Sequence, residues 1–593
     1  MKLLSTLFHA TTVVSFAIPQ TTKISGRALP DSPSGGYAPV REDCPSERPA
    51  IRDASDGILN EETEWLKRRD KKTGPAFLEF VKRVKINDFD IESYLSQENA
   101  QPRLAAAISG GGYRSFFHSA GILKAADDRT PGSLEAGGIG GLLQSMTYVA
   151  SLSGGSWMTG SMFFNNFTGV HDLQNNHNVW QLQNNVIKGP PSTGKPFQSF
   201  GYISKLKAEV NDKYKAGFEV GLADYWGRAL MYQMVEGGGE QYTYSSIANT
   251  PSFTEADMPM PIIVAVGREP DTVEVNLNST VFETSPFEFG SWDDSPSAFV
   301  PIRYLGSSFD GGILPESEKC VRGYDSVSFV VGASSSLFNA VTANKLLPKM
   351  NLSPAEDKVL QTLANQLHIT KKDVAVYKPN PFYNFQESTN KLAKATELDL
   401  VDGAMDGQML PLWSLIQPSR AVDVIYSIDS GGDTEYYWPN GTSLRSTWER
   451  TIDGFRVEIP FPPVPDDNTF VNLKLNQRPS FFGCEASNFT AGLPPLIVYL
   501  PNAPMSHMSN VSTFTMAYEL EERDNLILNG YNVGTQGNST SWGTCLACAA
   551  LSRSFTRTGT TVPQDCVNCF KEYCWDGSID ITPAKYEPTP LLG

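Results

Sequence analysis

Two stretches of the chain decide its fold: L-A-A-A-I-S-G-G-G-Y-R at residues 104–114 and M-T-Y-V-A-S-L-S-G-G-S-W at residues 146–157. In each, an apolar run short enough for a buried strand enters a glycine-rich turn. A helix-like pattern then follows, over 115–125 in the first case and 157–164 in the second. A further buried strand is predicted at 495–500. Alternating strands and helices predict an α/β fold, a three-layer sandwich with a mostly parallel central sheet, whose functional groups gather at the carboxyl ends of the strands.

Ser153 is the candidate nucleophile in the second stretch. It stands in L-S-G-G between the predicted strand and its helix, where Gly154 and Gly155 relieve crowding around a tight turn. Ser151 occupies the position at which the usual G-x-S-x-G nucleophile elbow has glycine, so the plain motif is incomplete. An ordinary helix N-cap is the structural alternative for Ser153.

The glycine-rich turn of the first stretch suits the stabilisation of an oxyanion. Gly110, Gly111 and Gly112 can direct backbone N–H groups to one point because no Cβ atom obstructs a close approach. A nucleotide-binding loop would need further signature residues, which do not follow. Arg114 comes instead, and an arginine beside such a loop can bind a substrate phosphate.

A serine nucleophile needs a base, and histidine is the first candidate. The chain has six histidines, none of which lies in a glycine-flanked turn after an apolar strand: His9, His118, His171, His177, His368 and His507. Aspartate does so twice, at Asp310 in D-G-G and at Asp402 in L-V-D-G-A-M-D-G-Q. A carboxylate on such a turn can take the proton of a serine hydroxyl directly.

The N-terminus has the pattern of a signal peptide at residues 1–17, with a basic start, an apolar centre and small residues at the end. An N-terminal strand or helix of the fold is the alternative. Residues 18–42 are predicted to be a flexible leader, and 43–593 a single large catalytic domain with insertions. No later stretch approaches the ~18 to 20 apolar residues of a membrane helix, so we expect no transmembrane anchor and a secreted or wall-associated product.

Asparagine and cysteine usage agrees with export. The glycosylation pattern N-x-S/T occurs seven times, at Asn166, Asn278, Asn351, Asn440, Asn488, Asn510 and Asn538. The cysteines are even in number: Cys44, Cys320, Cys484, Cys545, Cys548, Cys566, Cys569 and Cys574. Such usage is typical of an oxidising compartment.

Five of the cysteines crowd into residues 545–574 as two C-x-x-C pairs and a single cysteine. In a cytosolic protein this spacing would favour a zinc site. Because the chain carries an export signal, disulfides are predicted here and no metal. With five cysteines in the segment, at least one must pair outside it or stay free.

The net charge of −17 excludes one class of partner. Binding to nucleic acid relies on clustered lysine and arginine, so no nucleic-acid partner is expected. If the protein acts on lipid, apolar and aromatic contacts must bring it to the interface.

Six segments, in this order over about residues 100–510, together resemble the fungal phospholipase B/lysophospholipase family. They are S-G-G-G-Y-R, T-Y-V-A-S-L-S-G-G-S-W, D-Y-W-G-R-A-L at 224–230, G-A-S-S-S-L-F-N at 332–339, L-V-D-G-A-M-D-G-Q-M-L-P-L, and P-L-I-V-Y-L-P-N-A-P at 495–504. More distantly, they are similar to the catalytic domain of mammalian cytosolic phospholipase A and to patatin.

This resemblance implies a serine–aspartate dyad without histidine, and no metal or other cofactor. The site residues that it implies are the nucleophile Ser153, the base Asp402, the oxyanion donors Gly111 and Gly112, and the phosphate-binding Arg114 and Arg420. The chain departs from the family pattern at Ser151 and at Ala404, where the family has glycine. Asp310 is disfavoured because its segment does not carry the base in the family.

The reaction so implied is hydrolysis of fatty-acyl esters of phospholipids and lysophospholipids, presented at membrane or micelle interfaces, through an acyl-enzyme. A lysophospholipid acyltransferase is an alternative, because the acyl-enzyme is common to both reactions. A non-catalytic lipid-binding glycoprotein on the same fold is the other alternative.

Overall fold

The computed structural model describes residues 31–191, 198–269, 272, 274–336, 374–452, 459–490 and 492–592. The expected signal peptide at 1–17, the leader up to residue 30 and Asn351 lie outside these ranges.

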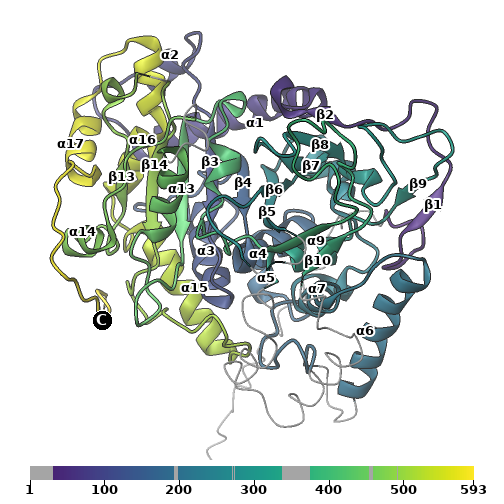
Figure 1. Ribbon diagram of the computed structural model, residues 1–593. Helices are drawn as coiled ribbons and strands as arrows, with labels where there is room; N and C mark the ends of the chain where they lie inside the picture. The colour runs from purple at the N-terminus through teal and green to yellow at the C-terminus, as the bar shows by residue number, and fades with distance from the viewer. Residues whose placement is uncertain are drawn as a thin grey trace, which may run out of the picture.

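A sheet of 12 strands forms the centre of the molecule (Figure 1). In order of pairing, its main path contains β13 (Ser480–Phe482), β14 (Leu496–Pro501), β12 (Val424–Asp429), β3 (Leu104–Ile108), β4 (Met146–Ser151), β5 (Met260–Arg268), β6 (Val281–Thr284), β7 (Glu288–Ser291), β8 (Ala298–Pro301) and β2 (Arg52–Asp53). Two strands lie off this path, β11 (Leu398–Asp402), which pairs with β5, and β10 (Ala375–Tyr377), which pairs with β11.

The central strands are parallel, as predicted. Strands β14, β12, β3, β4 and β5 pair in parallel, and the strands on either side of them pair antiparallel. Every residue of β3, β4, β12 and β14 is buried. Such strands read as continuous apolar runs because both faces of a parallel sheet are covered.

Helices cover both faces of this sheet, which confirms the predicted α/β class. On one face, the Tyr148 hydroxyl of β4 donates to Glu62 of α1 (Asn60–Val84), 2.7 Å away. Through Ala105 of β3, Tyr148 is in register with Ile425 of β12, so the next residue of β12, Tyr426, points to the opposite face. There its hydroxyl donates to the carbonyl of Leu546 in α16 (Trp542–Thr558). Helices α3 (Tyr113–Ala126) and α15 (Leu520–Thr535) pack together on this second face.

The remaining α-helices connect and surround these layers: α2 (Ile91–Leu95), α4 (Ser153–Phe164), α5 (Val170–Asn175), α6 (Gln198–Lys215), α7 (Leu222–Met234), α8 (Pro251–Thr254), α9 (Val327–Ser334), α12 (Leu412–Leu415), α13 (Thr442–Ile452), α14 (Asp467–Asn472) and α17 (Gln564–Tyr573). None of the helices within the described ranges combines the length and the apolar character that crossing a bilayer requires.

The last part of the expected leader is ordered. Residues of β1 (Val40–Glu42) pair antiparallel with β9 (Cys320–Arg322), and Cys44 then forms a disulfide with Cys320. The expectation of a flexible segment up to residue 42 is therefore wrong at its C-terminal end, because backbone pairing to β9 holds this segment.

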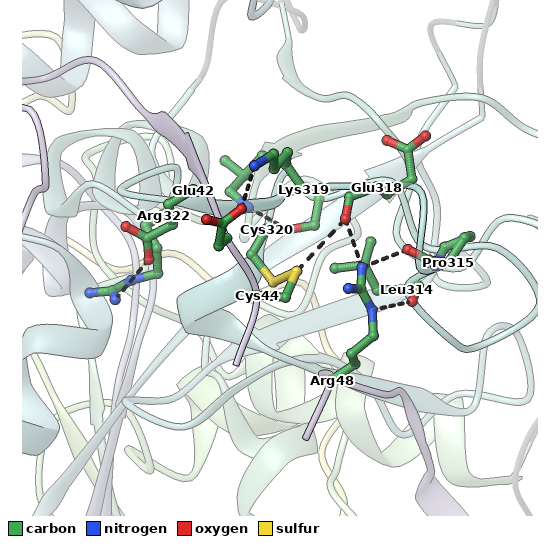
Figure 2. Close-up of a disulfide and its surroundings, with 12 residues drawn as sticks. Glu42, Cys44, Arg48, Leu314, Pro315, Glu318, Lys319, Cys320 and Arg322 are labelled. Carbon is green, nitrogen blue, oxygen red and sulfur yellow. Dashed lines mark hydrogen bonds and ion pairs between the residues drawn. A yellow bond between two sulfur atoms is a disulfide. The ribbon is translucent and has the colours of Figure 1, made fainter. Parts of the chain in front are cut away.

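A single arginine reinforces this attachment. The Arg48 guanidinium donates hydrogen bonds to three backbone carbonyls of the loop before Cys320, those of Leu314, Pro315 and Glu318 (Figure 2). The disulfide and these hydrogen bonds together fasten the N-terminal segment to a loop that is 276 residues away at Cys320.

The C-terminal cysteines form disulfides, as predicted. Cys545 pairs with Cys569, and Cys548 pairs with Cys566, so that two bonds join α16 to α17. The fifth cysteine, Cys574, pairs outside the cluster with Cys484.

Candidate active site

Ser153 stands on a sharp turn between β4 and α4. Its φ is 48°, a left-handed conformation that is unusual for a residue with a side chain. The turn depends on the two glycines that follow. A Cβ atom on Gly154 would lie 2.1 Å from the carbonyl oxygen of Gly112, and one on Gly155 would lie 2.7 Å from that of Ser109. The helix predicted from residue 157 therefore begins earlier, at Ser153 itself, as in a nucleophile elbow.

Asp402 meets this serine from the end of β11. The Ser153 hydroxyl donates a hydrogen bond of 2.8 Å to Asp402 Oδ2, and the Ala404 N–H donates one of 2.9 Å to Oδ1. Asp402 is fully buried, and this burial raises the pKa of its carboxyl to about 7, with Asp406 adding to the effect. The Ser153 hydroxyl is thus hydrogen-bonded to a buried carboxyl group whose pKa lies near neutrality.

The glycine loop after β3 lies beside this pair. Gly111 and Gly112 have φ values of 131° and 60°, and a Cβ atom on either would lie 2.7 Å from a backbone oxygen. The N–H of Gly110 donates to the Met409 carbonyl at 3.0 Å, whereas within the described part of the chain the N–H groups of Gly111 and Gly112 have no acceptor. Since α3 begins at the next residue, these amides also carry the positive end of a helix dipole. The loop can therefore bind an oxyanion.

Arg114 is buried directly behind the glycine loop. Its Nε donates to the Ser430 carbonyl at 2.9 Å and its Nη1 to the Val511 carbonyl at 2.8 Å. Nη2 lies on the side of Gly111, 3.1 Å from the position of a Cβ atom there. No carboxylate among the described residues forms an ion pair with this guanidinium. Burial lowers the pKa of Arg114 to about 10, which leaves it protonated at neutral pH and able to attract an anion.

Arg420 does not join these residues. It precedes the N-terminal end of β12, whereas Ser153 follows the C-terminal end of the parallel strand β4. Its guanidinium is bound by the Glu283 carboxylate through contacts of 2.5 and 2.9 Å. The role in phosphate binding that the family resemblance implied for Arg420 therefore does not fit its position, because the residue is a buried ion-pair partner at the other end of the sheet.

Ser334, at the end of α9, is a site residue that sequence reasoning missed. Its hydroxyl accepts a hydrogen bond of 3.1 Å from the Ser153 N–H and donates one of 2.6 Å to the Val264 carbonyl. Its own carbonyl accepts from the Gly403 N–H at 3.1 Å. Ser334 thus joins the turn at Ser153 to the turn at Asp402. The only signal was its place in the segment G-A-S-S-S-L-F-N.

The segment D-Y-W-G-R-A-L belongs to α7, which holds α9 in place. Arg228 donates to the Ser328 hydroxyl at 2.8 Å, and Trp226 donates to the Ser335 hydroxyl at 3.1 Å. A Cβ atom on Gly227 would lie 1.8 Å from the Ser328 carbonyl, so the two helices pack backbone against backbone. This segment therefore packs directly against α9, the helix that ends with Ser334.

The two other candidates for the base lie elsewhere. Asp310 is exposed and accepts a hydrogen bond from Asn384. His118 is buried in α3, with its Nδ1 atom 2.9 Å from the Ser430 hydroxyl. Burial lowers the pKa of His118 to about 3, so that its imidazole stays neutral. Neither contacts Ser153.

The described sequon asparagines all reach the surface to some extent. Asn278, Asn488 and Asn538 are exposed, whereas Asn166, Asn440 and Asn510 are half-buried. Of the half-buried three, Asn510 donates through its side-chain amide to the Tyr436 carbonyl at 2.8 Å.

Comparisons with known proteins show which family the chain belongs to. A family model described as the lysophospholipase catalytic domain matches residues 104–580. The chain is 48% identical to a lysophospholipase of Penicillium chrysogenum over 95% of this chain and 94% of that protein. It is also 48% identical to lysophospholipase 1 of Aspergillus fumigatus, over 97% of this chain and 92% of that protein.

Among solved structures, human GIVD cytosolic phospholipase A2 has a similar fold, with a TM-score of 0.63 at 17% identity, covering 86% of this chain and 67% of that one.

Proposed function

Because the chain belongs to the lysophospholipase catalytic-domain family, we propose that it hydrolyses fatty-acyl esters of lysophospholipids and phospholipids through Ser153 and Asp402. The observation that carries this proposal is the 2.8 Å hydrogen bond from the Ser153 hydroxyl to a buried carboxylate, beside two glycine amides that face a possible oxyanion. Such a pair can activate serine without histidine.

The first half of the reaction acylates the enzyme. Ser153 Oγ attacks the ester carbonyl carbon while Asp402 Oδ2 accepts the hydroxyl proton. The N–H groups of Gly111 and Gly112 bind the negative oxygen of the tetrahedral intermediate, and each such donor typically lowers the barrier by roughly 2.7 to 4 kcal/mol. The proton then passes from Asp402 to the leaving alcohol, which departs as a lysophospholipid or a glycerophosphodiester.

The second half releases the fatty acid. A water molecule attacks the acyl-serine ester while Asp402 accepts its proton, and the proton returns to Ser153 Oγ as the acid departs. The pKa of Asp402, raised to about 7 by burial, makes this carboxylate a stronger base than an ordinary aspartate. The reaction uses no metal or other cofactor.

Arg114 is the proposed partner of the substrate phosphate. Its Nη2 group lies next to Gly111, the loop residue assigned to the oxyanion. A phosphate at this point would place the glycerol ester within reach of Ser153, since both groups belong to one small molecule.

The setting of this activity is outside the cell. Disulfides between α16 and α17 and the exposed sequons Asn278, Asn488 and Asn538 support a secreted glycoprotein. Among the sequons, these three exposed asparagines are the positions that we propose most directly as glycosylated. The net charge of −17 opposes nucleic acid as a partner and favours a lipid interface reached by apolar contacts.

A covalent serine-hydrolase probe tests the proposal most directly. Labelling at Ser153 that disappears in the Ser153→Ala protein is the expected result, whereas a non-catalytic lipid-binding glycoprotein would not label. Product analysis with lysophosphatidylcholine as the sole lipid then separates the two reactions of an acyl-enzyme. Release of free fatty acid supports hydrolysis, and formation of phosphatidylcholine indicates an acyltransferase.

A further inference from the structure

Five exposed apolar side chains lie together beside the candidate active site. They come from three segments, and we call them the apolar edge: Tyr436, Tyr437, Met508, Leu591 and Leu592, each between 40% and 67% exposed. Hydrogen bonds join the three segments. The Asn510 side chain donates to the Tyr436 carbonyl, and the N–H of Leu591 donates to the Pro504 carbonyl at 3.1 Å. The three segments that carry the apolar edge therefore lie side by side.

Two of these segments also build the active site. The Val511 carbonyl holds Arg114, and the Thr513 carbonyl lies against Gly112. The ring of Tyr437 has its centroid 5.8 Å from the Arg114 guanidinium carbon. A partner that touches the apolar edge would consequently stand next to the proposed phosphate site.

The charge around the apolar edge selects the kind of partner. Residues 433–440, 503–516 and 586–592 contain no lysine or arginine, although the exposed Lys585 directly precedes the last range. Glu435 and Glu587 lie next to Tyr436, and Glu587 accepts a hydrogen bond from its hydroxyl. Because these two carboxylates outnumber that lysine, the exposed tyrosine, methionine and leucine side chains suit the boundary between headgroups and acyl chains of a lipid layer that carries no net charge. An anionic layer would be repelled.

We propose that the apolar edge docks the enzyme on zwitterionic lipid surfaces, so that a lipid enters the site from the layer with its phosphate next to Arg114. This inference rests on the proposed function and adds the surface through which the substrate arrives. The last residues of the chain thereby become part of the lipid-binding machinery.

The test compares two triple variants in the Ser153→Ala background, which allows binding without hydrolysis. Met508→Ser/Leu591→Ser/Leu592→Ser alters the apolar edge and leaves Tyr437, which contacts Arg114, intact. Ile313→Ser/Val562→Ser/Val567→Ser is the matched control, because these apolar side chains are 62%, 36% and 44% exposed and belong to other parts of the surface. Binding is measured by sedimentation with phosphatidylcholine vesicles and, separately, with phosphatidylserine vesicles.

The apolar-edge variant should bind phosphatidylcholine vesicles about tenfold or more weakly, given the apolar area removed, while the control variant binds as the parent does. With Ser153 restored, the apolar-edge variant should hydrolyse a soluble ester below its micelle concentration at the parental rate.

Unchanged vesicle binding would overturn the proposal, as would tighter binding to phosphatidylserine. So would a change from dimer to monomer in the variant, which would assign the apolar edge to a second copy of the chain, or a glycan on Asn510 of the active protein, which would cover it. Failure of the parent to hydrolyse any ester would contradict the proposed function instead, since vesicle binding is measured in the inactive background.

Discussion

Gly154 and Gly112 are in backbone contact, so that a Cβ atom on Gly154 would lie 2.1 Å from the Gly112 carbonyl oxygen. The first residue follows the proposed nucleophile and the second belongs to the proposed oxyanion loop. Their strands pair in parallel, with Ile108 opposite Ser151, and the turns that leave the two strands therefore meet. The relative position of the attacking oxygen and the oxyanion donors is set by this contact.

Replacement of Gly154 by alanine should lower kcat/KM by about 100-fold or more, because the new methyl group pushes the two turns apart and misplacing reacting groups by ~1 Å costs about this much. Steady-state kinetics on lysophosphatidylcholine measures the loss. Gly160→Ala on the same helix is the control, since its Cβ atom would meet only Val331 at 3.4 Å. Equal activity of Gly154→Ala and the parent would contradict the assigned geometry.

Ser153→Ala and Asp402→Asn should each reduce turnover by a factor on the order of 10⁴ or more, while both proteins fold. The double variant should be hardly slower than either single one, because nucleophile and base act as a unit. Asp310→Asn should keep parental activity, since Asp310 is exposed and bound to Asn384. Substantial turnover by either single variant would exclude the dyad.

The activity should rise with pH through a range well above that of an ordinary aspartate. Burial raises the pKa of Asp402 to about 7, and the carboxyl can accept the serine proton only when ionised, so kcat/KM should increase as the pH passes this value. Asp406 contributes to the raised pKa, and Asp406→Asn should move the rising limb to lower pH. A limb near pH 4 in the parent would show that Asp402 is not the titrating base.

Arg114→Ala should lose much more activity on lysophospholipid than on a neutral ester without phosphate, since only the first offers the guanidinium an anionic partner. The ratio of the two kcat/KM values is the measurement. Arg114 also holds the carbonyls of Ser430 and Val511, and equal losses on both substrates would indicate that this structural role is the whole of its function. Arg114→Lys keeps the charge and should recover part of the phosphate-dependent activity.

The disulfide between Cys548 and Cys566 should stabilise the C-terminal helices without any zinc. Its two cysteines are 18 residues apart, and closing a loop of this size contributes about 3 kcal/mol in the chain-entropy model. Replacing both cysteines by alanine should lower the free energy of unfolding by about this amount. Peptide mapping without reductant and metal analysis of the native protein complete the test. Bound zinc together with free thiols would reverse the assignment.

Local sequence patterns correctly predicted the parallel strands that precede the two glycine-rich turns. The strands at 104–108 and 146–151 and the turns after them follow from apolar runs bounded by glycine. The antiparallel strands from β6 to β8 were not predicted, because strands of four residues carry little periodic signal.

In the candidate site, too, only the residues with a local sequence signal could be predicted from the sequence pattern itself. Ser153 and the glycine loop carry local signals, whereas the pairing of Asp402 with Ser153 joins residues 249 positions apart and entered through the family resemblance. Arg420 shows the limit of such a transfer, since its partner Glu283 comes from an antiparallel strand that no sequence pattern placed next to it. Ser334 was missed because a serine at the end of an apolar helix has no distinguishing pattern.

The attachment of Arg114 to the Val511 carbonyl spans 397 residues of sequence. A chain emerging from the ribosome exposes Ser153 and the glycine loop well before Val511, whose carbonyl holds Arg114 behind this loop, has been synthesised. A nascent chain that has not yet reached Val511 therefore lacks a completed site.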